Sequence, residues 1–126
     1  MKKLFEQVNQ DALVISILGN YSDFQQIGVS AFKLITARRG VAVTESDFSR
    51  VVGAMRSLPV NAEVRGQLER LKQHGVSMLT LTNSPPAFVA AQLENAEISH
   101  FFDKQLSVDS VKAFKLAAKV YKHAEI

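Results

Sequence analysis

Residues 76–86 read Val76-Ser77-Met78-Leu79-Thr80-Leu81-Thr82-Asn83-Ser84-Pro85-Pro86. A short apolar, β-prone run ends in a hydroxyl and an amide, and a Ser-Pro pair that can open a helix follows at once. This order predicts a strand, a turn and a helix. The carboxyl ends of strands face the ligand crevice in open α/β sheets, so Thr82 and Asn83 are expected to meet a small anion there. The same two side chains suit, equally well, a turn that needs no ligand.

The segments around this turn predict an α/β arrangement. We expect a helix over residues 61–74 that Gly75 ends, a strand over 76–82, and a helix over 85–96 with proline at its start. A second strand is expected over 105–108 and a last helix over 116–123. Helices between strands imply a parallel pair with crossover helices, and two parallel strands are too few for a stable sheet. The sequence therefore indicates part of a larger α/β core.

The residues before Pro59 show only helical signals. Residues 3–18 have apolar side chains near helical spacing, and a second helix is expected from Ser22 or Asp23 as far as Gly40. The segment Thr44-Glu45-Ser46-Asp47 has the spacing of a capping box and opens a third helix. We therefore expect a helical unit over 1–60, followed by the unit with the strands over 61–126.

Composition narrows the classes of function. The chain has 126 residues, 47% of them apolar, which is enough for one domain with a buried core. Without cysteine it has no disulfide and no thiolate, and this suits a reducing compartment. A net charge of +3, spread over separate helices without interleaved aromatic residues, argues against a nucleic-acid partner. With neither a leader pattern nor a membrane-spanning run, a soluble cytoplasmic protein is expected.

Four stretches together resemble the type II haloacid dehalogenase branch of the haloacid dehalogenase superfamily. Tyr21-Ser22-Asp23-Phe24 is similar to a stretch of that branch's helical cap, and 68–75 to the helix before its second core strand. Leu81-Thr82-Asn83-Ser84-Pro85 is similar to the second superfamily motif. The segment from Phe101 through Leu106-Ser107-Val108-Asp109 to Phe114-Lys115 resembles the approach to the third motif, a lysine. The resemblance implies a helical cap followed by part of a Rossmann-like core.

The resemblance also implies roles for particular residues. Thr82 and Asn83 would bind the carboxylate of a small acid or a phosphate oxygen, and Lys115 would pair with a nucleophilic carboxylate. Three further residues would line the substrate site, namely Phe24, Ser84 and Tyr121. Alone, Lys115 is an ordinary helix-flanking lysine, Tyr121 a residue at the edge of the core, and Phe24 a core residue. The chemistry implied is attack by an aspartate on the halogen-bearing carbon of a small 2-haloacid, or on the phosphorus of a phosphate ester, and water then hydrolyses the covalent intermediate.

The aspartate that attacks belongs to an Asp-x-x-x-Thr motif, which these 126 residues do not contain. Asp11, Asp23 and Asp47 have no strand before them and cannot replace it. We therefore expect a cap and partial core without activity of its own, and neither a cofactor nor a metal site; His74, His100 and His123 have no ligand spacing. A non-enzymatic interaction protein of the same fold is the alternative. An unpaired strand edge predicts a homodimer or higher oligomer.

Overall fold

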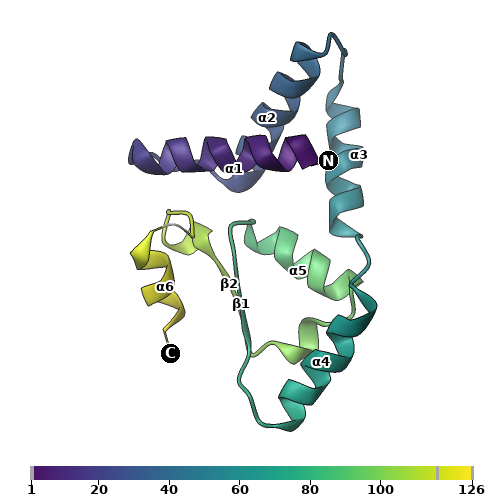
Figure 1. The fold of residues 1–126 in the computed structure, drawn as a ribbon, viewed down its shortest axis with the longest axis vertical. Helices are drawn as coiled ribbons and strands as arrows, with labels where there is room; N and C mark the ends of the chain where they lie inside the picture. The colour runs from purple at the N-terminus through teal and green to yellow at the C-terminus, as the bar shows by residue number, and fades with distance from the viewer. Residues whose placement is uncertain (1, 116, 126) are drawn as a thin grey trace.

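The computed structural model describes residues 2–115 and 117–125. Three helices come first, and a helix, a strand, a helix, a 3-10 turn, a strand, a second 3-10 turn and a last helix follow (Figure 1). The elements are α1 (Lys2–Ile17), α2 (Phe24–Arg38), α3 (Glu45–Arg56), α4 (Ala62–Gln73), β1 (Leu79–Thr82), α5 (Pro86–Asn95), the 3-10 turn η1 (Ser99–Phe101), β2 (Lys104–Ser107), the 3-10 turn η2 (Val108–Ser110) and α6 (Ala118–Ala124). The predicted α/β class and the order of its elements are confirmed. The start predicted for the last helix, Leu116, lies outside the described residues.

Local capping explains where the first helices begin. The Asp23 carboxylate accepts a hydrogen bond from the Gln26 N–H at 2.9 Å and so caps α2. At α3 the predicted capping box is present: the Asp47 N–H donates to the Thr44 hydroxyl at 3.2 Å, and the Thr44 N–H donates to the Asp47 carboxylate at 2.9 Å. Each cap satisfies N–H groups that have no partner inside their helix.

The two strands pair in parallel, with Leu79 opposite Lys104 and Thr82 opposite Ser107. The prediction that the first strand starts at residue 76 is wrong. Gly75 adopts a φ of 71°, and the Val76 N–H then donates to the Leu71 carbonyl at 3.1 Å. The residues after α4 thus still donate hydrogen bonds to the last carbonyls of that helix. Pairing with β2 begins only at Leu79.

The second strand also differs from its prediction, since it ends at Ser107 instead of 108. The Ser107 hydroxyl accepts a hydrogen bond from the Asp109 N–H at 3.2 Å, which turns the chain into η2. Val108 therefore leaves the ladder but stays fully buried. Neither 3-10 turn was expected from the sequence.

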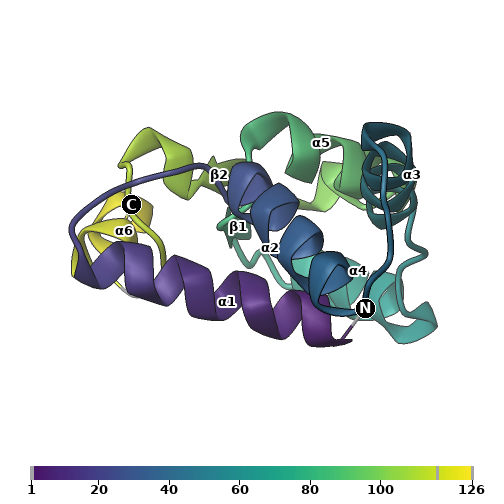
Figure 2. The ribbon, with the colours of Figure 1, turned by 90° about the horizontal axis from the view of Figure 1, so that it is seen from above.

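One apolar cluster joins the first two helices to the strand region. It contains residues of α1 and α2 together with side chains that follow β2: Val8, Ala12, Ile27, Ala31, Val108, Phe114 and Val120. Seen from above, α2 crosses over α1, and α6 lies beside the C-terminal half of α1 (Figure 2). This cluster fixes the helical part against the carboxyl ends of the strands, where the expected site lies.

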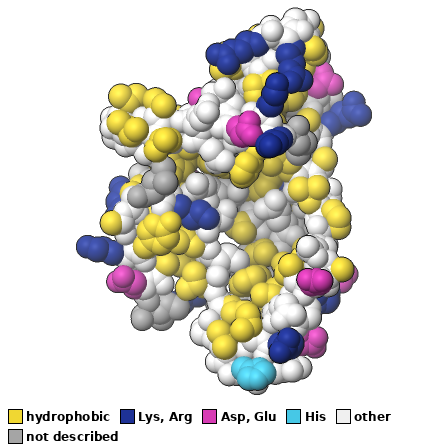
Figure 3. Space-filling view, in the orientation of Figure 1, with side chains coloured by type: hydrophobic (Ala, Val, Ile, Leu, Met, Phe, Trp, Pro, Cys, Tyr) yellow, Lys and Arg dark blue, Asp and Glu magenta, His cyan; other side chains and the backbone are white. Residues whose placement is uncertain are grey.

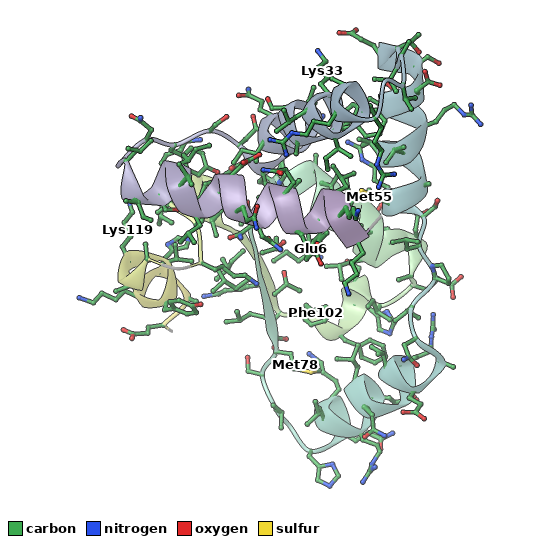
Figure 4. All side chains as sticks on the ribbon, turned by 45° about the horizontal axis from the view of Figure 1, so that its top comes forward. Glu6, Lys33, Met55, Met78, Phe102 and Lys119 are labelled. Atoms are coloured by element: carbon green, nitrogen blue, oxygen red, sulfur yellow. The ribbon has the colours of Figure 1, made fainter. Side chains whose placement is uncertain are left out.

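A second apolar cluster forms at the other end of the sheet. Its buried members come from the strand region, α5 and η1: Met78, Val89, Leu93, Ile98 and Phe101. Phe102 packs against them, and Figure 4 shows it close to Met78. Beside this cluster, hydrogen bonds from Lys72 Nζ, the Met78 N–H and the Ser77 hydroxyl lower the pKa of the Asp103 carboxyl to about 2. That carboxylate fastens α4 and the start of β1 to the start of β2.

Helix α3 is attached to α5. Gln92 Nε2 donates to the Met55 carbonyl and Asn95 Nδ2 to the Arg56 carbonyl, both at 3.1 Å, while the Arg56 guanidinium lies 5.3 Å from the centroid of the Phe88 ring. In the part of the chain that the structure describes, every helix is too short or too polar to cross a membrane.

Candidate active site

The turn that follows β1 carries three of the predicted residues. Thr82 ends the strand, and its hydroxyl oxygen accepts a hydrogen bond from the Ser84 N–H at 3.1 Å. Pro85 then precedes α5, whose first turn has proline and no side-chain cap. The N–H groups at the start of an uncapped helix attract anions, through both their dipoles and their free hydrogens. The turn thus holds a hydroxyl and a half-buried amide beside an uncapped helix start.

Lys115 reaches this turn from the far end of the chain. Its backbone N–H donates to Asn83 Oδ1 at 3.0 Å, and its ammonium Nζ donates to the Leu81 carbonyl at 3.2 Å. The Lys115 side chain is partly buried, and its ammonium lies at the Leu81 carbonyl, one residue before Thr82. The structure therefore brings together the three residues predicted to be catalytic.

The Lys115 ammonium lies at the open edge of β1. Across the sheet, the Asp103 N–H donates to the Met78 carbonyl at 2.8 Å. Backbone groups alternate in direction along a strand, so those of Thr80 and Thr82 face β2, and those of Leu79 and Leu81 face the other edge. Among the described residues no strand pairs with that edge. The bond from Lys115 satisfies one of its free carbonyls.

Phe24 and Ser84 share an apolar cavity of about 470 Å³. Side chains from α1, α2, α3 and α5 surround it, and most of them are apolar: Leu4, Phe5, Val8, Phe48, Val51, Val52, Met55, Leu58, Pro85 and Phe88. Figure 4 shows Met55 where α3 approaches the start of α1. Apolar side chains surround the hollow between α1 and the elements below it in Figure 3. Both predicted residues thus lie where an apolar substituent could be held beside the turn.

Tyr121 was expected beside Lys115. It lies on α6 with 53% of its surface exposed, and in the described part of the chain no hydrogen bond joins its hydroxyl to Lys115. The neighbouring Val120 is the α6 residue that points into the core.

Two residues that were not predicted to be functional, Tyr21 and Asp109, meet beside the site. The Tyr21 hydroxyl donates to the Asp109 carboxylate, and the Tyr21 ring packs on Phe114 with centroids 5.2 Å apart. Burial, and then the bond to Asp109, raise the pKa of the Tyr21 hydroxyl well above its usual range. Both residues lie in stretches that carry the family resemblance, but no local signal pairs side chains 88 positions apart.

No three His, Asp or Glu side chains among residues 2–115 and 117–125 come together as a metal site would require. The groups that do converge are a hydroxyl, an amide and an ammonium. Such a set binds and neutralises a small anion, and a lysine favours the ionised form of a nearby carboxylate.

A parallel strand pair with a crossover helix, preceded by a helical unit, fits a cap followed by part of a Rossmann-like core, and Lys115 bonds to the turn after its first strand. The family model of haloacid dehalogenase-like hydrolases matches residues 3–125. The chain belongs to this family, in its type II haloacid dehalogenase branch.

Relatives with known names are similar across most of the chain. An (S)-2-haloacid dehalogenase of Pseudomonas sp. strain YL is 30% identical over 110 residues, which are 87% of this chain and 47% of that protein. A second (S)-2-haloacid dehalogenase, from Pseudomonas fluorescens, is 26% identical over 87% of this chain and 48% of its own length. The chain thus spans about half the length of the curated relatives it matches.

Solved structures show the same fold. The L-2-haloacid dehalogenase of Xanthobacter autotrophicus matches 98% of this chain and 49% of its own, with a TM-score of 0.89 at 22% identity. L-2-haloacid dehalogenase RSc1362 matches 97% of this chain and 56% of its own, with a TM-score of 0.92 at 23% identity. The predicted combination of a helical cap with part of the core is confirmed.

Proposed function

We propose that this chain supplies the anion-binding turn and the lysine of a hydrolase that splits the carbon–halogen bond of a small 2-haloacid. One observation carries the proposal: the Lys115 backbone N–H donates to Asn83 Oδ1 and its ammonium donates to the Leu81 carbonyl, directly before Thr82. In this proposal residues 1–60 form the cap, and residues 61–126 form part of the core. A cytoplasmic location is proposed as well, because the chain has no cysteine.

Each residue has a distinct part in the proposed reaction. Thr82 and Asn83 bind the substrate carboxylate, while Phe24 and Ser84 line the space for its apolar part. Lys115 keeps a nucleophilic aspartate ionised and offsets its charge as it attacks carbon and expels halide. Water then hydrolyses the ester to the hydroxy acid. The chain's own aspartates have other positions, and the nucleophile is proposed to lie outside these 126 residues.

Small anions are expected to bind weakly at residues 82–86. A titration with acetate, chloroacetate and phosphate, followed by backbone amide NMR, should move the resonances of this turn and of Lys115. Lys115→Met keeps the apolar stem but removes the charge, and should weaken binding about tenfold, in the range of a lost charge-assisted hydrogen bond.

Lys119→Met is the matched control, because its ammonium lies on the exposed face of α6 and donates only to the Lys112 carbonyl at 3.5 Å among the described contacts. Shifts that gather elsewhere, or equal losses in both lysine variants, would remove the proposed site. Phosphate binding that clearly exceeds chloroacetate binding would favour phosphate esters as substrates.

We also propose that the chain forms a homodimer or higher oligomer. One edge of β1 has no strand partner in the described part of the chain, and α1 exposes several large apolar side chains: Phe5, Leu13, Val14, Ile17 and Leu18. An apolar helix face and an open strand edge both favour association. If the alternative holds and the protein acts without catalysis, this same surface is its interface.

Light scattering after size exclusion, over at least a tenfold dilution series, should give the mass of two or more chains. The double variant Ile17→Glu, Leu18→Glu places two charges on the exposed end of α1 and should shift the mass to one chain. Asn9→Glu, Gln10→Glu adds the same two charges at exposed polar positions of α1 as a control. A wild-type monomer with a cooperative thermal transition at low concentration would contradict the proposal.

A further inference from the structure

Tyr21 and Asp109 connect the helical part of the chain to its strand region. Tyr21 lies in the segment between α1 and α2, and Asp109 lies in η2, directly after β2. The bond from the Tyr21 hydroxyl to the Asp109 carboxylate spans 88 residues of sequence. A hydrogen bond to a charged acceptor is stronger than one between neutral groups. This contact therefore joins the two parts with a specific polar link, in addition to the apolar cluster around it.

The hydrogen bonds continue from Asp109 to the turn after β1. The Asp109 N–H donates to the Ser107 hydroxyl at 3.2 Å, and that hydroxyl donates to the Ser84 carbonyl at 2.7 Å. Ser107 is buried, so its hydroxyl exchanges little with water. A continuous path thus runs from Tyr21 through Asp109 and Ser107 to Ser84, one residue beyond the Thr82–Asn83 pair.

The ring of Tyr21 has a second path to the same place. It packs on Phe114, whose ring also lies 6.1 Å from that of Phe24, and Lys112 Nζ lies 5.2 Å from the Tyr21 ring centroid. Phe114 is almost fully buried and directly precedes Lys115. Aromatic and cation–π contacts of this kind fix ring orientation. The position of Tyr21 is thereby coupled to Phe24 on one side and to Lys115 on the other.

We infer that Tyr21 and Asp109 are positioning residues that hold the Thr82–Ser84 turn and Lys115 in register with Phe24. Neither residue needs to touch the substrate for this. The inference rests on the proposed anion-binding role of the turn. Packing alone would make the Tyr21 ring important and its hydroxyl dispensable, whereas positioning through the hydrogen-bond path makes the hydroxyl itself necessary.

Tyr21→Phe removes the hydroxyl and keeps the ring. We expect this variant to fold, to shift the amide resonances of Ser84 and Asp109, and to weaken chloroacetate binding about three- to tenfold, the range of one hydrogen bond. Asp109→Asn should have a similar effect, and the double variant should be little worse than either single one, because both break the same link. Ser22→Ala is the control, since its hydroxyl donates to Gln26 on the surface.

A second readout does not depend on any anion. The chain has two tyrosines and no tryptophan, so in a Tyr121→Phe background the absorbance of tyrosinate reports Tyr21 alone. The alkaline midpoint of Tyr21 should fall towards the ordinary value when Asp109→Asn is added. A failure of wild type to bind anions would overturn the proposed function and leave this readout intact. An unchanged midpoint, together with unchanged Ser84 resonances in Tyr21→Phe, would overturn the inference.

Discussion

Replacing Phe114 by alanine is expected to lower the free energy of unfolding by about 3–5 kcal/mol, the range for truncating a buried phenylalanine. Phe114 is the largest fully buried side chain among the described residues, with 2% of its surface exposed. Its ring contacts Tyr21 and Phe24, so the truncation leaves a cavity where the helical part meets the strand region. Urea unfolding followed by far-ultraviolet circular dichroism gives the free energy.

This loss is large relative to the total free energy of unfolding of a small domain, so a second variant is useful. Domains of this kind are stable by about 5–15 kcal/mol, so Phe114→Ala could leave too little folded protein to measure. Phe114→Leu keeps most of the volume and should lose less. Phe5→Ala is the control, because 57% of the Phe5 surface is exposed. A loss for Phe114→Ala no greater than that for Phe5→Ala would show that the cluster around Phe114 does not form.

Features decided within one helical turn were predictable from the sequence. The capping box at Thr44 and Asp47 and the cap at Asp23 depend on side chains three residues from their partners. The start of β1 was predicted too early because Val76 has a β-prone side chain. The Val76 N–H nevertheless donates to the Leu71 carbonyl. This hydrogen bond at the end of α4 outweighs the β propensity of the Val76 side chain.

The candidate site was predictable in part. The turn at Thr82 and Asn83 follows from the geometry of parallel strands, and the role of Lys115 follows from the resemblance of residues 101–115 to the approach to the third motif. The link between Tyr21 and Asp109 was not predictable, because it depends on how the segment between α1 and α2 meets η2, and the sequence holds no periodic signal for such a contact. The exposure of Tyr121 has a related cause: α6 turns its Val120 side into the core, which leaves the next residue outside.

A polypeptide of residues 1–126 is expected to release no halide from 2-haloacids and no phosphate from simple esters. Loss of a covalent nucleophile typically costs about 10⁴–10⁶-fold in turnover, because binding alone stabilises substrate and transition state alike. None of the aspartates ends a strand. Asp11 lies within α1, and each of the others is engaged by its own neighbours: Asp23 and Asp47 in helix caps, Asp103 with Lys72, and Asp109 with Tyr21.

Asp109 is the aspartate to examine first, because hydrogen bonds through Ser107 connect it to the turn that holds the proposed anion site. Halide release and phosphate release should be measured on protein purified twice, beside Asp109→Asn and Lys115→Ala. Equal traces of activity in all three samples would come from a contaminant and agree with the expectation. Turnover that survives purification and disappears in Asp109→Asn would contradict the expectation, because the activity would then belong to the chain itself. Loss only in Lys115→Ala would contradict the expectation as well, since the lysine would then act on a nucleophile within these residues.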